Sequence, residues 1–194
     1  MKRARKISSP RNLILSSLFA ALLALMAQIS IPLPFSPVPI TGQTFGIFLA
    51  GALLGGRWGA VSILVYVLLG AIGLPVFHHG QGGLHIILGP TGGYLWGFVI
   101  GGYLLGKVAE KKNSFAALWS GMALCLIATY TLGILQLALL TGLSFEAALL
   151  AGVAPFILPD IIKVAAAATL SRAVKTRLFK AGLLPDPQEA GPGI

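Results

Sequence analysis

The chain has 194 residues, of which 56% are hydrophobic and only 10% are charged. Soluble domains carry about 25% charged residues, so this composition excludes an ordinary water-soluble domain, which needs a polar shell. The net charge of +9 does not indicate nucleic-acid binding, because the basic residues form short clusters at the ends of apolar runs rather than a continuous stripe. The composition predicts a membrane-embedded protein.

Long apolar segments follow one another along the chain, and each is expected to form a transmembrane helix. About 20 helical residues cross the hydrocarbon layer of a membrane. The first segment is too long for a typical signal peptide, so we expect it to be retained. The predicted fold is an all-α membrane protein with six transmembrane helices in a compact bundle. These six segments are residues 12–31, 40–56, 58–74, 92–108, 115–140 and 148–170.

Lysine and arginine are confined to one side of this six-helix arrangement. They occur in residues 2–11, at Arg57, in residues 107–112 and after the last helix, whereas the three connections on the other side contain neither type. By the positive-inside rule, both termini are cytoplasmic in a multi-pass protein of the cell (inner) membrane. The predicted domains are a basic N-terminus (1–11), a transmembrane substrate-binding domain (12–175) and a disordered cytoplasmic tail (176–194).

Asp160 and Lys163 are an acid and a base that lie inside a predicted span rather than at its cytoplasmic end. Charged groups at membrane depth are costly unless they are paired or hydrated, so they usually mark a functional site. Their spacing places both side chains on one helix face, directly after the helix-bending Pro159. The alternative is an ion pair that only stabilises the bundle, although a hydrophobic pair would do so at lower cost. We predict that both residues bind substrate.

Two connections supply further candidate substrate-binding residues. The proline-rich stretch after the first helix is expected to be stiff and extended, and it brings Thr41 and Gln43 to the start of the second helix. Their hydroxyl and amide groups suit an uncharged polar ligand, although Thr41 could equally cap the helix. The glycine-rich connection after the third helix contributes His79, Gly89 and Tyr94, since glycine permits close approach of the backbone to a ligand.

Metal-binding and catalytic signals are weak. His78, His79 and His85 are expected to be pocket-lining or surface residues, because adjacent histidines usually point apart and no acid is close in sequence. The sequence contains no phosphate-binding P-loop, no nucleophile elbow, no zinc-protease motif and no pair of intramembrane carboxylates. We therefore expect neither an enzyme nor a metal or cofactor in this chain.

Small residues line one face of the first predicted helix. Ala20 and Ala24 are one turn apart, and Ser16 and Ser17 extend the same surface. Because a smooth face of this kind lets another helix approach closely, Ala20 and Ala24 are candidates for docking a partner membrane protein. Ordinary packing within the chain is the alternative.

Five stretches, in order along the chain, resemble the BioY family, the substrate-binding (S) components of energy-coupling-factor (ECF) transporters. His78 and His79 depart from the family pattern, because small or amide residues are expected there. The resemblance implies a six-helix bundle, high-affinity capture of biotin from the outer face, and two kinds of partner, an ECF transmembrane coupling protein and ABC-type ATPase subunits. The matching stretches are residues 37–43 (PVPITGQ), 56–59 (GRWG), 69–77 (LGAIGLPVF), 89–97 (GPTGGYLWG) and 158–163 (LPDIIK).

Biotin suits the charged pair chemically. Its ureido ring presents N–H donors beside a carbonyl, and its tail ends in a carboxylate. We expect Asp160 to accept a charge-assisted bond from a ureido N–H and Lys163 to donate to either the ureido carbonyl or the tail carboxylate. Docking on the coupling protein through the small face of the first helix, and release driven by the partner ATPases, complete the implied cycle.

The sequence is also compatible with other functions. One is an S component for a different vitamin, such as thiamine or riboflavin, and another is a solitary biotin transporter that works without ATPase partners. A purely structural membrane protein is a further alternative, but it would have no use for Asp160 and Lys163. Titration of the purified protein with a panel of vitamins would separate these functions.

Overall fold

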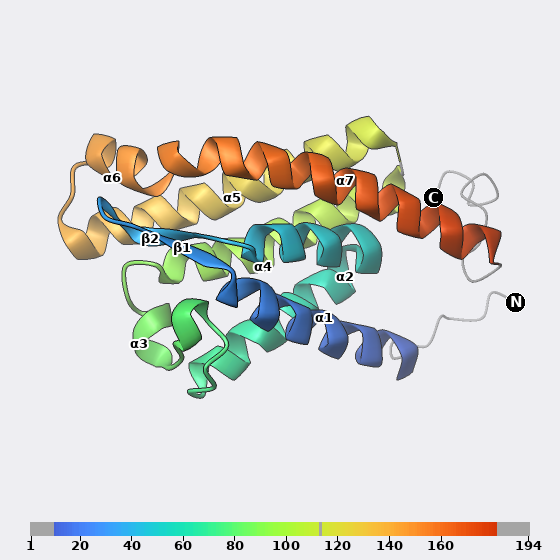
Figure 1. Ribbon diagram of the computed structural model, residues 1–194, viewed down its shortest axis with the longest axis horizontal. Helices are drawn as coiled ribbons and strands as arrows, with labels where there is room; N and C mark the ends of the chain where they lie inside the picture. The colour runs from blue at the N-terminus through green and yellow to red at the C-terminus, as the bar shows by residue number, and fades with distance from the viewer. Residues whose placement is uncertain (1–9, 113, 182–194) are drawn as a thin grey trace, which may run out of the picture.

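The computed structural model describes residues 10–112 and 114–181, and they form an elongated bundle of long helices (Figure 1). The helix α4 packs against both α2 and α5, while α7 lies along α2 and α5. The predicted N-terminal segment and tail therefore fall largely outside the described residues, although α7 extends the helical part of the chain to Lys180. The helices are α1 (Pro10–Gln28), α2 (Gln43–Ala71), α3 (Leu84–Ile87), α4 (Gly92–Lys111), α5 (Phe115–Thr141), α6 (Phe145–Gly152) and α7 (Ile157–Lys180).

The helix α2 reverses direction at Gly55, so its two halves run antiparallel. Gly55 has a positive φ of 81°, which glycine adopts without steric cost. The Gln43 amide at the start of α2 donates to the Tyr66 hydroxyl at 2.7 Å, whereas a straight helix would separate these residues by about 35 Å. The Glu110 carboxylate of α4 accepts from the Gly56 N–H at 2.9 Å and ties this reversal to α4. The predicted boundary between the second and third helices is therefore present as a tight turn.

A two-stranded antiparallel sheet joins α1 to α2, and this is a correction to the all-α prediction. The strands β1 (Ser30–Leu33) and β2 (Ser36–Thr41) pair Ser30 with Thr41 and Ile31 with Ile40. The prolines of this stretch cannot occupy a helix interior but are compatible with extended backbone. The extended conformation was expected from the proline content, and the pairing of the two strands was not.

The last predicted span is divided at its prolines. The helix α6 ends at Gly152, a short 3₁₀ segment covers Ala154–Phe156, and α7 begins at Ile157. Pro159 thus lies in the first turn of α7, where a missing N–H breaks no helical hydrogen bond. Asp160 shares that first turn, where the positive end of the helix dipole stabilises a carboxylate.

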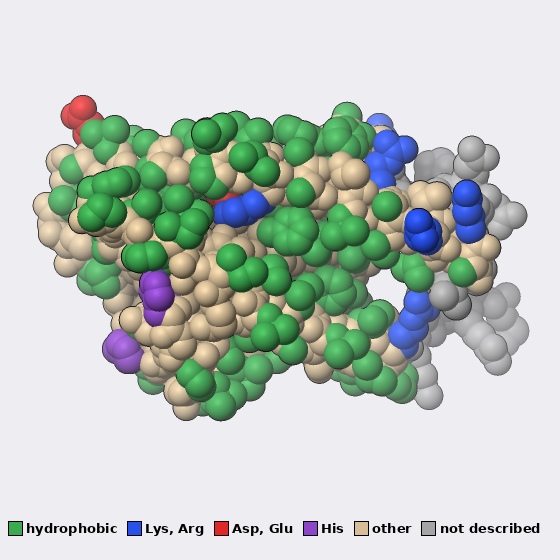
Figure 2. Space-filling model, viewed as in Figure 1, with side chains coloured by type: hydrophobic (Ala, Val, Ile, Leu, Met, Phe, Trp, Pro, Cys, Tyr) green, Lys and Arg blue, Asp and Glu red, His purple; other side chains and the backbone are tan. Residues whose placement is uncertain are grey.

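The surface of the bundle is apolar along its length. Large hydrophobic side chains such as Ile72 and Leu139 are 77% and 81% exposed, and Figure 2 shows hydrophobic side chains along the body of the visible face, with Lys and Arg gathered mainly near the end where α1 begins and α7 ends. Four stretches of the described chain are long and apolar enough to cross a membrane: Pro10–Gln28, Gln43–Ala71, Phe115–Thr141 and Phe145–Leu178. The count of six spans and the cytoplasmic termini stay predictions.

Part of the small face of α1, namely Ser16 and Ala20, packs inside the protein. Ser16, Ala20, Leu23 and Ala27 are its buried residues, and the Ser62 hydroxyl of α2 donates to the Ser16 carbonyl at 2.9 Å. Ala20 is only 2% exposed, so this arrangement leaves no surface for a partner at Ala20. Packing within the chain, the alternative considered from the sequence, describes that residue, while Ala24 is partly exposed.

Candidate substrate-binding site

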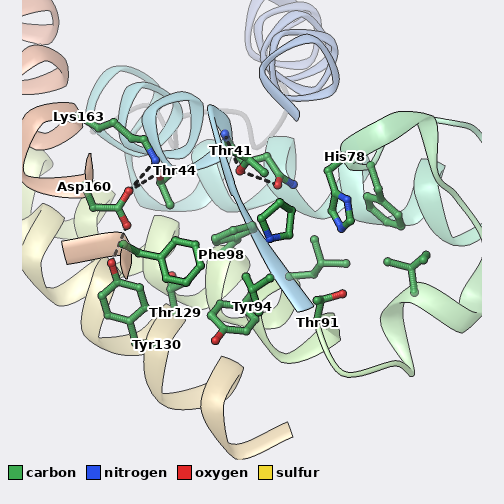
Figure 3. Close-up of a pocket in the computed structure, with 17 residues that line it drawn as sticks. Thr41, Thr44, His78, Thr91, Tyr94, Phe98, Thr129, Tyr130, Asp160 and Lys163 are labelled. Carbon is green, nitrogen blue, oxygen red and sulfur yellow. Dashed lines mark hydrogen bonds and ion pairs between the residues drawn. The ribbon is translucent and has the colours of Figure 1, made fainter. Parts of the chain in front are cut away.

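A pocket lies where β2, the start of α2 and the connection after α2 meet α4, α5 and α7 (Figure 3). The space inside it, including open solvent at its mouth, is about 610 Å³. Most of the exposed area of its wall is apolar, as expected of a site that binds a small amphipathic molecule. The aromatic residues of the wall are Phe77, Tyr94, Phe98, Tyr130 and Phe156.

Asp160 and Lys163 form a hydrogen-bonded cluster at one end of this pocket. The Lys163 ammonium lies 2.7 Å from Oδ1 of Asp160 and also donates to the Thr44 hydroxyl at 3.0 Å. Thr44 in turn donates to Oδ1 of Asp160 at 3.0 Å, and the Tyr130 hydroxyl donates to Oδ2 at 2.6 Å. Asp160 is 2% exposed. The Lys163 side chain is 18% exposed. The predicted pair is thus a buried acid with a partly buried base, and the sequence did not predict its partners Thr44 and Tyr130.

The cluster retains hydrogen-bonding capacity for a ligand. A carboxylate offers about four acceptor sites and an ammonium three donors. Among the described residues, Asp160 accepts three hydrogen bonds and Lys163 donates two. By this count one acceptor site on Oδ2 and one N–H of Lys163 have no partner among the described residues. That combination matches a ligand group that carries a donor next to an acceptor.

Thr41 and Gln43 also line the pocket, and their polar groups are largely engaged with one another. The Thr41 hydroxyl donates to Oε1 of Gln43 at 2.9 Å and accepts from the Gln43 backbone N–H at 3.3 Å. The Gln43 side chain also bonds to Tyr66, as described above, and it is 4% exposed. Thr41 therefore lines the pocket and accepts from the N–H of Gln43, the first residue of α2, but the N-cap position of α2 is Gly42, which has no side-chain cap.

The glycine-rich connection contributes differently from the prediction. Tyr94 lines the pocket, and its hydroxyl donates to the Gly152 carbonyl at 2.9 Å, which links α4 to the end of α6. Gly89 does not line the pocket, and its carbonyl accepts from Gln136 of α5 at 2.7 Å. His79 is exposed and lies outside the pocket, whereas the neighbouring His78 lines it. In the structure, His78 rather than the predicted His79 is therefore the histidine that can contact a ligand in the pocket.

Two lining residues that were not predicted to bind substrate can be recognised in the sequence as polar residues within an apolar run. Tyr130 and Thr129 are polar residues in the middle of the apolar run that forms α5, and a polar group at membrane depth is a functional candidate by the same reasoning that selected Asp160. Within residues 10–112 and 114–181, no group of His, Cys, Asp and Glu side chains is arranged to hold a metal ion.

Comparison with known proteins identifies the family. The family model described as "BioY family" matches residues 1–180, and a curated protein of Thermotoga maritima named "Biotin transporter BioY" is 44% identical over 166 residues, covering 85% of this chain and 96% of that protein. This chain belongs to the BioY family. A second BioY protein, a biotin transporter from Rhizobium etli, is 39% identical over 86% of this chain and 94% of its own length.

The BioY assignment extends to three dimensions. The solved structure described as the S-component for biotin from an ECF-type ABC transporter has a TM-score of 0.80, with 27% sequence identity, and the match covers 91% of this chain and 95% of that one. The resemblance found in the five sequence stretches is thereby confirmed. These BioY relatives are named transporters, so the prediction that the chain is not an enzyme is also confirmed. With several membrane-spanning helices, it is a multi-pass membrane protein.

Proposed function

We propose that this protein captures biotin with high affinity from the outer face of the cell (inner) membrane, as the S component of an ATP-driven importer. The names of its BioY relatives support biotin as the ligand. The observation that carries the proposal is the free acceptor site on Asp160 beside the free donor of Lys163, at one end of an aromatic pocket.

The ureido ring of biotin complements this end of the pocket. One ureido N–H donates to Oδ2 of Asp160, and the adjacent ureido carbonyl accepts from Lys163, so both new bonds are charge-assisted. The apolar bicycle then packs against the aromatic wall that includes Phe98 and Tyr130. Two charge-assisted bonds with an apolar enclosure are compatible with nanomolar binding, about 12 kcal/mol.

The partner subunits in this proposal are an ECF transmembrane coupling protein and ABC-type ATPases. The absence of a P-loop from the sequence supports the assignment of ATP hydrolysis to other subunits. Docking through the first helix now rests on Ala24, because Ala20 is buried. Ala24→Trp is expected to prevent uptake by the assembled importer and to leave biotin binding by the isolated chain intact. Uptake by proteoliposomes that contain this chain alone would favour the solitary transporter.

Calorimetric titration of the purified protein with biotin, thiamine and riboflavin tests the ligand assignment. Asp160→Asn and Lys163→Ala are each expected to weaken biotin binding by more than about tenfold, since each removes a charge-assisted bond. The matched controls are Glu146→Gln and Lys112→Ala, which make the same kinds of change at exposed positions. Tighter binding of thiamine or riboflavin than of biotin would overturn the assignment.

A further inference from the structure

His78 lies at the end of the pocket opposite to Asp160 and Lys163 (Figure 3). It belongs to the short 3₁₀ segment His78–Gly80 in the connection between α2 and α3. Its Nε2 atom is shielded from water and has no hydrogen-bond partner within the described chain. A buried polar atom without a partner is unfavourable, so a ligand that supplies a partner would gain from the contact.

The other nitrogen of His78 is already engaged. Its Nδ1 lies 3.1 Å from Nδ1 of His79, and the two rings meet edge to face with their centroids 5.3 Å apart. Two neutral imidazoles can share such a contact only if one nitrogen donates and the other accepts. When His78 itself carries the extra proton, its ring donates from Nδ1 to His79 and presents an N–H at Nε2 as well.

The backbone around His78 is held in place. His79 has a positive φ of 55°, which is uncommon for a residue other than glycine and persists where the surroundings enforce it. From α1, the Gln28 amide donates to the Phe77 carbonyl at 3.1 Å and accepts from the Gly80 N–H at 3.0 Å. Phe77 is itself buried, with its ring edge-on to Tyr66 at 5.5 Å. These contacts hold the backbone that carries the imidazole of His78 in one position.

The electrostatic surroundings of His78 favour an anion. Asp160 is the one carboxylate among the described lining residues, and it lies at the far end of the pocket. The other titratable lining groups are Tyr94, Tyr130 and Lys163. From α1 the connection meets the uncharged Gln28, and the nearby α3 carries His85. Thr91, which precedes the N-terminal end of α4, also lines this side of the pocket, and the dipole of α4 adds positive potential there.

We propose that Nε2 of His78 donates a hydrogen bond to the tail carboxylate of the bound ligand, and that His78 takes up a proton as this anion binds. This inference rests on the proposed function and deepens it, because it sets the direction of the ligand in the pocket. The acceptor and donor of Asp160 and Lys163 match the ureido group, and Asp160 would repel a carboxylate. The acid-free end at His78 therefore receives the tail.

The pH dependence follows from the burial of His78. Burial lowers the pKa of its imidazole, and the neighbouring His79 lowers the pKa further, so the free protein holds His78 neutral at pH 7. A bound carboxylate favours the protonated ring and raises the pKa. Affinity for an anionic ligand therefore increases as the pH falls through the pKa of the complex, and it levels off below the pKa of the free protein. An uncharged ligand tail removes this dependence.

Calorimetry of the purified full chain with biotin and with biotin primary amide tests the inference. Titrations at several pH values between about 5.5 and 7.5 keep an alkyl carboxyl ionised, and two buffers of different ionisation enthalpy count the protons taken up. Wild-type protein is expected to take up a measurable fraction of one proton with biotin and none with the amide. His78→Phe is expected to bind biotin about tenfold more weakly, without proton uptake, and to lose less affinity for the amide, which forms no charge-assisted bond with His78.

His78→Gln is the second variant, because it keeps an N–H donor near the position of Nε2 but does not titrate. It is expected to recover most of the biotin affinity and to show no proton uptake. Wild-type affinity and proton uptake in His78→Phe would overturn this inference alone, provided that Asp160→Asn still weakens binding. Failure of the wild-type protein to bind biotin at any of these pH values would overturn the proposed function, and this inference with it.

Discussion

The two ends of the pocket differ in how completely their polar groups are satisfied. At the Asp160 end, side chains from α2, α5 and α7 form a closed set of hydrogen bonds with one acceptor and one donor left over. At the His78 end, a single connection supplies a ring nitrogen with no partner. The first end is assembled before the ligand arrives, because a buried charge must be paired in the empty state. The His78 end is neutral, so leaving its ring nitrogen unpaired in the empty state costs less free energy than leaving a charge unpaired.

The largest expected effect is on Asp160 and Lys163, where a single and a double variant distinguish the contribution of the ion pair to stability from its contribution to biotin binding. Asp160→Asn alone leaves the Lys163 ammonium unpaired and is expected to destabilise the protein by about 3 kcal/mol, together with the loss of binding. The double variant Asp160→Asn with Lys163→Met removes both charges, so its melting temperature is expected to recover while biotin binding stays lost. Recovery of both properties in the double variant would reduce the pair to a structural role.

The next effect concerns the hydroxyl that orients Asp160. Tyr130→Phe removes the donor to Oδ2 at 2.6 Å and is expected to weaken biotin binding by about tenfold, because a bond to a charged group is lost. Tyr103→Phe, at an exposed position of α4, makes the same change as a control. Equal affinities of the two variants, measured by calorimetry, would show that Asp160 does not depend on Tyr130 for its position.

A smaller effect is expected at the frame of the His78 end. Gln28→Leu removes the bonds from α1 to the Phe77 carbonyl and the Gly80 N–H, so the connection that carries His78 loosens. We expect biotin affinity to fall by about fivefold, with the affinity for biotin primary amide affected less. Gln81→Leu changes an exposed glutamine of the same connection and serves as the control. An equal loss for both ligands would indicate a general disturbance of the pocket.

The smallest effect is expected from the exposed member of the histidine pair. His79→Phe removes the nitrogen that faces Nδ1 of His78 but leaves Nε2 in place. Biotin affinity near neutral pH is expected to fall by about threefold or less, while proton uptake on binding shrinks, since the shared proton has lost its acceptor. Unchanged proton uptake in calorimetry would show that His78 titrates independently of His79.

The features that the sequence predicts most accurately are those whose free energy depends on single side chains rather than on contacts between distant residues. The transfer of an apolar side chain into lipid, and the cost of a charge at membrane depth, depend mainly on residue type. That is why the apolar segments match α1, α4 and α5 closely. It is also why Asp160 and Lys163 were identifiable before their surroundings were known. The turn at Gly55 was likewise predictable, because two glycines are followed there by the charged Arg57.

The contacts that complete the site were not predictable in this way. Thr44, Tyr130 and Asp160 come from three segments more than 25 residues apart, and no periodicity in the sequence records which helix faces meet. The same holds for the burial of Ala20 and for the position of Gly89 outside the pocket. The choice between His78 and His79 depended on one residue with a positive φ, which propensity does not predict for histidine.

Residue types and their order are enough to predict that this protein is embedded in a membrane, where its basic residues cluster, and that Asp160 and Lys163 lie at membrane depth. Each of these follows from the solvation free energy of individual side chains. Only the packing of the helices decides which groups surround Asp160 and Lys163, that Ser16 and Ala20 of α1 are buried, and which histidine lines the pocket. These depend on how helices pack and on where one connection turns, and packing is a property of pairs of surfaces rather than of single residues.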